Sequence, residues 1–277
     1  FSNFSIDILS VWCYTHDTQE QMCFPGKELS MHEPAYNPSV VPDITRSAPL
    51  TARHQQAPRP RRDPYDGLRP WSAITHGVGA VLAAIGTVVL AVGSALAGKW
   101  AMMAIFLVYG LSMVCLYTAS TLYHCINTTP AKRIALRKYD HCSIYLLIAG
   151  SYTPICMTVL WGGVGAPLLL AIWLCAAAGI ILTIAKLDIP RWLTSVIYLF
   201  MGWLAILAIV PLSRLMPLAG MVWLLLGGGM YTVGGVLYAV KWPGRNNPRF
   251  GCHEIFHVFI LLGSVCHFMM MLVIAGM

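Results

Sequence analysis

Charged side chains are scarce in this sequence. Its 18 Lys and Arg and 11 Asp and Glu make up 10% of 277 residues, whereas hydrophobic residues make up 57%. Ordinary globular domains carry about 25% charged residues. In this chain the few charged residues lie between long apolar runs, so it is not an ordinary soluble domain. The composition predicts a polytopic membrane protein.

The sequence also lacks a continuous basic surface and a regular cysteine pattern. The formal net charge is +7, but the basic residues lie in short segments between apolar runs rather than along one polar face. This distribution argues against nucleic-acid binding. The nine cysteines show no short regular spacing. Those within apolar runs are interpreted as small hydrophobic residues.

The first 70 residues differ in kind from the rest. They are rich in Pro, Ser and charge and have no helical periodicity, so we expect a polar, disordered tail. The apolar stretch at the start is interrupted by Asp7 and is not preceded by basic residues, which argues against a signal peptide. The predicted organisation is a tail of residues 1–70 followed by a membrane domain of residues 71–277.

Seven apolar spans follow, each long enough to cross a bilayer as a helix. The predicted fold is therefore all-α, a bundle of seven transmembrane helices. The breaks between spans are polar or rich in Gly and Pro, and the longest polar break runs from Asn127 to Lys138. The expected spans are 73–95, 100–124, 140–160, 166–186, 192–211, 217–240 and 252–275.

The distribution of Lys and Arg predicts the orientation. Following the chain across seven spans places thirteen basic residues on one side and only Lys99 and Arg214 on the other. Because basic loops stay in the cytoplasm, we expect a cytoplasmic N-terminus and an external C-terminus. This is the reverse of the G-protein-coupled receptor arrangement.

Two histidines at the start of the last span carry a ligand pattern. His253 and His257 are four residues apart, so both imidazoles project from one face of a helix. Intramembrane ionisable groups are costly and indicate function. The alternative is a pair of packing histidines hydrogen-bonded to neighbours. His267 lies about 21 Å along the same helix from His253, too far for the same metal, and is interpreted as a packing or cavity residue. His76 could line a cytoplasmic cavity, but packing is the preferred interpretation.

The predicted topology brings further polar residues to the same membrane depth. His124 closes the second span with Ser120 one turn before it, and Asp140 is expected to open the third span. Three imidazoles, from His124, His253 and His257, would leave a fourth zinc position open for water. Asp140 is predicted to accept a hydrogen bond from that water, and Ser120 to hold the water or a substrate oxygen.

These motifs resemble the haemolysin III family, which belongs with the progestin and adipoQ receptors, including the adiponectin receptors. The resemblance covers about residues 70–277 and rests on Ser120-x3-His124, Asp140 and His253-x3-His257, in that order. It implies zinc binding by His124, His253 and His257, with Asp140 and Ser120 around its water. The compact loops favour the bacterial branch, and hence the inner membrane.

The first functional hypothesis is a zinc-dependent hydrolase of a membrane lipid amide or ester, because the wider superfamily includes alkaline ceramidases. Two alternatives remain open. A structural zinc could clamp the helices of a receptor, channel or haemolytic pore former. His253-Glu254-x-x-His257 also matches the zincin signature, in which Glu254 would be the base of an intramembrane metalloprotease. The sequence does not predict an oligomeric state.

Overall fold

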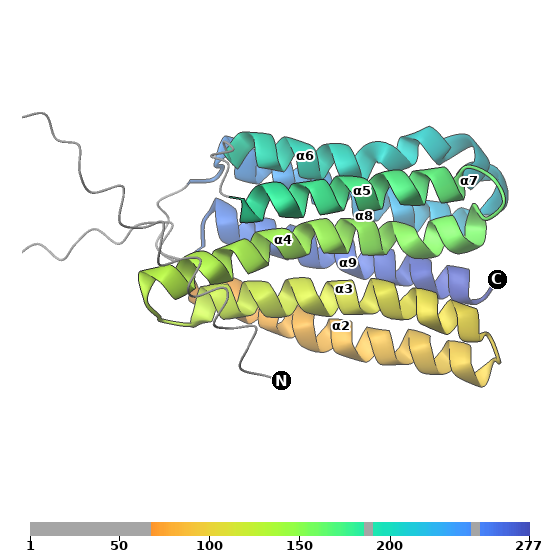
Figure 1. Cartoon of the computed structure of the whole chain (residues 1–277), viewed down its shortest axis with the longest axis horizontal. Helices are drawn as coiled ribbons and strands as arrows, with labels where there is room; N and C mark the ends of the chain where they lie inside the picture. The colour runs from red at the N-terminus through yellow and green to blue at the C-terminus, as the bar shows by residue number, and fades with distance from the viewer. Residues whose placement is uncertain (1–67, 186–190, 245–249) are drawn as a thin grey trace, which may run out of the picture. The chain divides into compact units, whose positions relative to one another are not determined.

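The computed structural model describes residues 68–185, 191–244 and 250–277, and every regular element within them is helical (Figure 1). The predicted tail of residues 1–70 therefore lies almost wholly outside the described residues. Most of residues 188–191 and 242–248, which separate predicted spans, lies outside them too. The elements are α2 (Pro70–Leu96), α3 (Trp100–Cys125), α4 (Pro130–Pro154), the π-helical turn η1 (Ile155–Val159), α5 (Gly165–Ile184), α6 (Arg191–Trp203), the 3-10 turn η2 (Leu204–Ala208), α7 (Ile209–Leu215), α8 (Leu218–Val240) and α9 (Cys252–Ala275).

The prediction of seven membrane-spanning helices is confirmed. Among the described residues, seven helical segments are long and apolar enough to cross a bilayer. Two of them join shorter pieces, because α4 continues into η1, and α6, η2 and α7 form one span. Most boundaries fall within a few residues of the predicted ones.

One boundary was wrong. Asp140 was expected to open its helix, but α4 begins at Pro130, and the polar stretch before Asp140 is helical. Proline is well tolerated in the first turn of a helix, and the following Ala, Lys, Arg and Leu residues favour helix formation. Hydropathy detects only the apolar part of such a helix. Asp140 therefore lies ten residues, or about 15 Å, from the helix start.

Most spans pack against a span next to them in the chain, and the last span packs against the first. Helix α2 packs along α3, α3 along α4, and α4 against α5 and α6, while α8 packs along α9 and α9 returns to α2. Figure 1 shows α4 in the middle of this arrangement. In its most apolar stretch 67% of the residues are buried, against at most 39% in any other span. Helix α4 is the central helix of the bundle.

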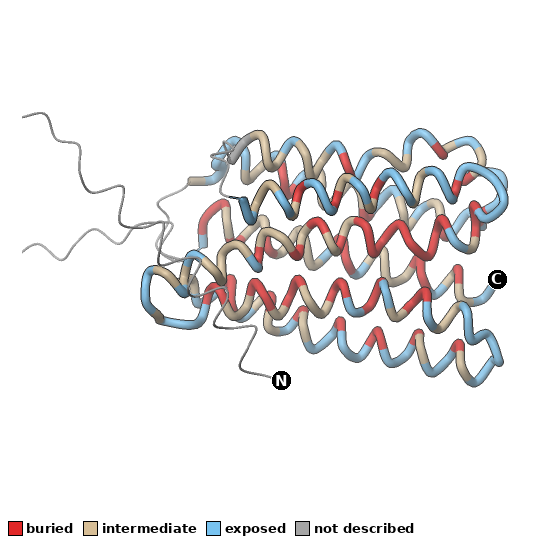
Figure 2. Tube along the Cα trace, in the orientation of Figure 1, coloured by how far each residue is buried: buried red, intermediate tan, exposed pale blue. Residues whose placement is uncertain are grey.

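Apolar side chains cover the outside of the bundle as well as its core. Val81, Ile85 and Val88 on α2 are 56–60% exposed, and Figure 2 shows buried residues on the inward faces of the helices and exposed residues on the outer faces. A soluble protein rarely leaves so large an apolar surface in water. Such a surface suits contact with the hydrocarbon of a membrane.

The irregular turn η2 is supported by one buried tyrosine. The hydroxyl of Tyr152 on α4 lies 2.9 Å and 2.8 Å from the carbonyl oxygens of Met201 and Gly202, and it accepts a hydrogen bond from the backbone N–H of Ala205 at 2.8 Å. Irregular backbone at membrane depth requires such partners, because lipid provides none. The central helix therefore stabilises the break in its neighbour.

Candidate metal centre

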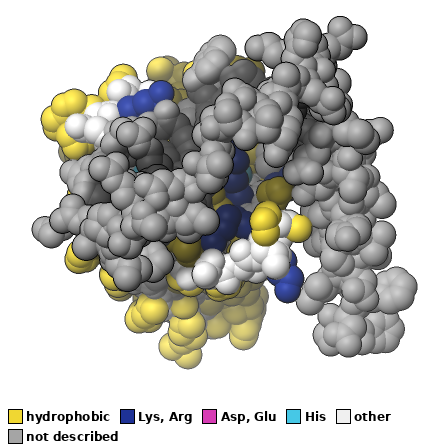
Figure 3. Space-filling model, turned by 90° about the vertical axis from the view of Figure 1, so that its left-hand side faces the viewer, with side chains coloured by type: hydrophobic (Ala, Val, Ile, Leu, Met, Phe, Trp, Pro, Cys, Tyr) yellow, Lys and Arg dark blue, Asp and Glu magenta, His cyan; other side chains and the backbone are white. Residues whose placement is uncertain are grey.

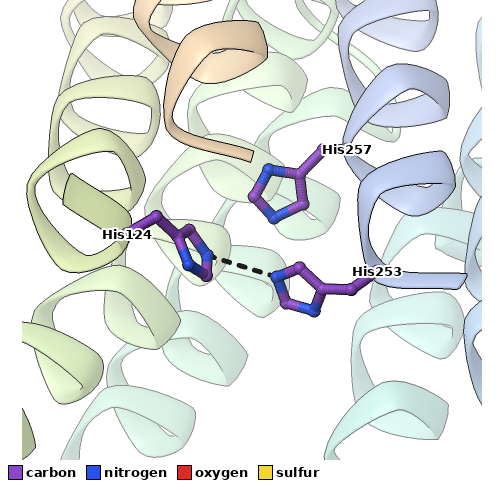
Figure 4. Close-up of side chains that lie close together, drawn as sticks. All are labelled: His124, His253 and His257. Atoms are coloured by element: carbon purple, nitrogen blue, oxygen red, sulfur yellow. Dashed lines mark hydrogen bonds between the residues drawn. The ribbon is translucent and has the colours of Figure 1, made fainter. Parts of the chain in front are cut away.

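Three histidines meet where α3 ends and α9 begins. His124 is in the last turn of α3, whereas His253 and His257 lie one turn apart at the start of α9. Figure 4 shows the three imidazoles pointing into one space between the two helices. His124 and His257 are only 2% and 3% exposed. The predicted convergence of these side chains is confirmed.

The spacing of the imidazole nitrogens fits a single metal ion. One nitrogen from each ring lies within 4.8 Å of the other two, so the three histidines form a group that could hold a metal. The Nε2 atoms of His253 and His124 are 3.2 Å apart. Two imidazoles bound tetrahedrally to zinc at about 2.0–2.1 Å hold their nitrogens roughly 3.4 Å apart. Small side-chain movements would complete such a shell.

Local backbone contacts fix both helix ends at the site. The backbone N–H of Gly251 donates to Oε2 of Glu254 at 2.9 Å, which caps the start of α9. The carbonyl oxygen of His124, in the last turn of α3, accepts a hydrogen bond from the backbone N–H of Arg69 at 3.1 Å. The first residues before α2 thus hold the histidine-bearing end of α3.

Glu254 connects α9 to α2. Its Oε1 accepts a hydrogen bond from Nη1 of Arg69 at 2.9 Å and one from Oγ of Ser72 at 3.4 Å. Both carboxylate oxygens are therefore already hydrogen-bonded to the protein. This ion pair has no signal in the sequence, because no spacing pattern relates Arg69 to a residue 185 positions later.

Ser120 and Asp140 lie buried beside the cluster, 1% and 9% exposed. The Ser120 side chain lies near enough to the Asp140 carboxylate to interact with it electrostatically. Ser120 is one turn before His124 on α3, so it lies between Asp140 and the histidine group. Nδ1 of the neighbouring His141 lies 2.8 Å from the carbonyl oxygen of Arg137 on its own helix and 3.9 Å from Oδ2 of Asp140. The predicted roles of Asp140 and Ser120 remain predictions.

A fourth histidine was assigned to packing and does pack, but against a member of the cluster. His76 on α2 is 3% exposed, and its ring stacks on that of His257, with centroids 3.7 Å apart and planes at 17°. The edge of its ring meets Tyr117 at 5.0 Å. Its proximity to the three-histidine group had no signal in the sequence except that an imidazole lies within an apolar span.

Comparison with known proteins assigns the chain to a family. A family model described as haemolysin-III related matches residues 70–268, which include all three histidines of the cluster. The chain belongs to the haemolysin III family. With its seven spans, it is a multi-pass integral membrane protein.

Two bacterial relatives of this haemolysin III-family chain match over most of their length. The hemolysin-3 homolog of Bacillus subtilis is 39% identical over 71% of this chain and 89% of its own length. Hemolysin-3 of Bacillus cereus is 38% identical over 71% and 87%. The ADIPOR-like receptor IZH2 of Saccharomyces cerevisiae is 31% identical over 27% of this chain and 24% of its own length. The predicted family resemblance is confirmed.

In this haemolysin III-family structure, the end of the bundle that carries the histidines is also the basic end. Figure 3 views it directly and shows Lys and Arg side chains on its described part. The opposite end carries Lys99 and Arg214. The described basic residues at the histidine end are Arg69, Lys132, Arg133, Arg137, Lys138 and Lys241.

Proposed function

We propose that this chain is a zinc-dependent hydrolase that cleaves an amide or ester bond of a membrane lipid. The observation that carries the proposal is a group of three imidazoles, two of them buried, whose nitrogens lie within reach of one metal ion. The buried Ser120 and Asp140 side chains interact with each other one turn away. Three protein ligands are the number that catalytic zinc sites use, because one position must stay open. Imidazole ligation makes zinc the default metal.

Each polar residue has a distinct part in this chemistry. A zinc ion bound by His124, His253 and His257 would supply a Lewis acid and lower the pKa of a water molecule. The Asp140 carboxylate would take a proton as general base and return it to the leaving group. The Ser120 hydroxyl, which interacts with Asp140, would orient that carboxylate. Burial of these groups would exclude bulk water from the site.

Orientation and location support a lipid substrate. The described basic residues cluster at the histidine end, so the positive-inside rule places this end in the cytoplasm, with the N-terminus inside and the C-terminus outside. The apolar outer surface would give an acyl chain direct access from the bilayer. Because the two relatives matched over most of their length are bacterial, we propose a bacterial cell membrane as the location, the inner one where there are two. Reporter fusions after Lys241 and at the C-terminus test this orientation, with cytoplasmic activity expected only from the first.

The alternative is a structural metal in a non-enzymatic receptor, channel or haemolytic pore former. Helices α3 and α9, which carry the three histidines, both pack on α2 and on α4. An ion held by both would stabilise the end of the bundle without any chemistry. This reading predicts loss of folding, rather than loss of turnover, when the metal is removed.

The structure argues against the metalloprotease alternative, because the carboxylate expected to act as general base is Glu254. Both oxygens of Glu254 are hydrogen-bonded to Arg69 and Gly251, which belong to the helix starts. A general base must be able to reach a water molecule or substrate. The engaged carboxylate argues for a structural role of Glu254 instead.

Hydrolysis of lipids by purified protein tests the proposal. We expect zinc-loaded protein in nanodiscs to cleave ceramide-like amides or lipid esters, and Asp140→Asn to retain zinc without turnover. Dye release from liposomes, with and without metal, is the matched assay for a pore. Zinc-bound protein that cleaves none of these lipids but releases dye regardless of metal would overturn the hydrolase.

A further inference from the structure

A second group of polar side chains lies inside the bundle, away from the metal centre. We call it the polar seam. It joins residues of α3, α8 and α9, three helices that are otherwise predominantly apolar. Its members are Tyr109, Tyr117, Tyr231, Ser264 and His267.

Three hydroxyl groups form the centre of the seam. Tyr117 donates to Oγ of Ser264 at 2.7 Å, and the hydroxyl of Tyr231 lies 2.9 Å from the same oxygen. These bonds connect one residue from each of the three helices. Each hydroxyl in this chain has a hydrogen-bond partner. Each can also accept a further hydrogen bond.

The outer members of the seam make no hydrogen bond of good geometry in the described part of the chain. Tyr109 is fully buried and its hydroxyl makes no hydrogen bond, although it interacts electrostatically with Tyr231 and Tyr117. Both ring nitrogens of His267 are buried without a hydrogen bond of good geometry, although the Leu224 backbone interacts with the ring. The ring meets Tyr231 edge-on, with centroids 5.2 Å apart. A neutral imidazole has one donor and one acceptor, so it keeps capacity for a further partner.

Two glycines make room for these polar rings. A Cβ atom at Gly227 of α8 would lie 2.7 Å from Nε2 of His267, and one at Gly263 of α9 would lie 2.7 Å from Cδ1 of Tyr231. Any larger residue would push the rings away. The backbone is therefore shaped to keep two polar aromatic rings between α8 and α9.

We propose that the seam binds ordered water between Tyr109, Tyr231 and His267. Buried water typically bonds to polar groups that are otherwise unsatisfied, and membrane hydrocarbon offers no other partner. The seam contains hydroxyl groups and one imidazole and no carboxylate, Lys or Arg side chain, which suits water rather than an ion. This proposal does not depend on the hydrolase activity.

The water site lies deep in the membrane, beyond the three histidines along α9. His267 lies fourteen residues beyond His253, about 21 Å along α9 in a hydrocarbon layer of about 30 Å. At the other end of the seam, Tyr117 contacts His76, which stacks on His257. The water site therefore extends a polar path from the metal centre into the middle of the membrane.

Radiolytic hydroxyl-radical labelling of the full chain in lipid nanodiscs tests the proposal, because internal water generates radicals beside it. We expect Tyr109 to be modified several-fold faster than Phe106, which is equally buried in the apolar core. Equal rates for Tyr109 and Phe106 would show a dry seam and overturn the proposal.

Two variants test independently whether the seam holds water. In a hydrated seam, His267→Leu removes a water partner, so it should lower both the labelling of Tyr231 and the melting temperature. In a dry seam the same change removes an unsatisfied group, so an unchanged labelling rate with a raised melting temperature would overturn the proposal. If His267→Leu fails to fold, Tyr109→Phe makes the same test while keeping the ring.

A glycine pair supplies the matched control. Gly227→Ala should displace His267 and reduce Tyr231 labelling, whereas Gly228→Ala, where a Cβ atom meets nothing within 4 Å, should leave it unchanged. Equal labelling in both variants would count against His267 as part of the water site.

Discussion

Oε1 of Glu254 lies 2.9 Å from Nη1 of Arg69, so the acidic residue between the two α9 histidines is paired with the start of α2. Its other oxygen caps its own helix through Gly251. The Glu of the protease-like pattern His253-Glu254-x-x-His257 therefore joins helix α9 to the start of α2. The pair holds α2 and α9 together beside the histidines.

Replacing Glu254 with Gln should therefore affect stability more than chemistry. Because a hydrogen bond to a charged group contributes about 1.5–3 kcal/mol, we expect the apparent melting temperature to fall by an amount equivalent to about 2 kcal/mol. Zinc content should stay near that of the unmodified protein. Ser72→Ala, which removes only the 3.4 Å contact to Glu254, is the milder control. A Glu254→Gln protein of normal stability that has lost all turnover would restore the protease reading.

Removing any one histidine of the cluster should abolish stoichiometric zinc binding. His124→Ala, His253→Ala and His257→Ala each leave only two of three imidazoles, and we expect metal analysis to find a loss of about 100-fold or more in affinity. His141→Ala is the matched control, because that ring bonds to the Arg137 carbonyl on its own helix. Full zinc occupancy in all three cluster variants would refute the metal centre.

Asp140→Asn should lower the turnover number by about 10²–10⁴-fold without releasing zinc, the range typical of a lost general base. Ser120→Ala should lower it by about 10-fold or more, because the carboxylate loses its interaction with the Ser120 hydroxyl. Ser143→Ala is a control on the same helix, since Ser143 donates at 2.6 Å to the backbone carbonyl of Asp140 and not to its carboxylate. Equal losses in the Ser120 and Ser143 variants would mean that both act through folding alone.

Gly79→Ala should destabilise the contact between α2 and α3. A Cβ atom there would lie 2.7 Å from Cδ1 of Tyr117, and overpacking of this kind costs about 1–3 kcal/mol. Gly93→Ala on the same helix meets nothing within 4 Å and should be neutral or slightly stabilising. Thermal unfolding of the two variants in one detergent measures the difference. A Gly79→Ala protein as stable as Gly93→Ala would show that Tyr117 moves freely.

The sequence by itself determined the number and type of the spans, because twenty-residue apolar runs have one stable form in a membrane. It also determined the meeting of His124 with His253 and His257, since helix ends on one side of a membrane share a depth. Their i, i+4 spacing supplied the shared face. These are properties of short segments and of topology.

The tertiary structure alone decided how distant segments meet. The start of α4 at Pro130 was hidden because a polar helix has no hydropathy signal. The pairing of Arg69 with Glu254 and the stacking of His76 on His257 depend on how α2 packs against α9. Helix rotation and lateral packing are set by many weak contacts together, and no local pattern encodes them. The histidine motif at the start of α9 is thus readable from the sequence, whereas the partners that hold it are not.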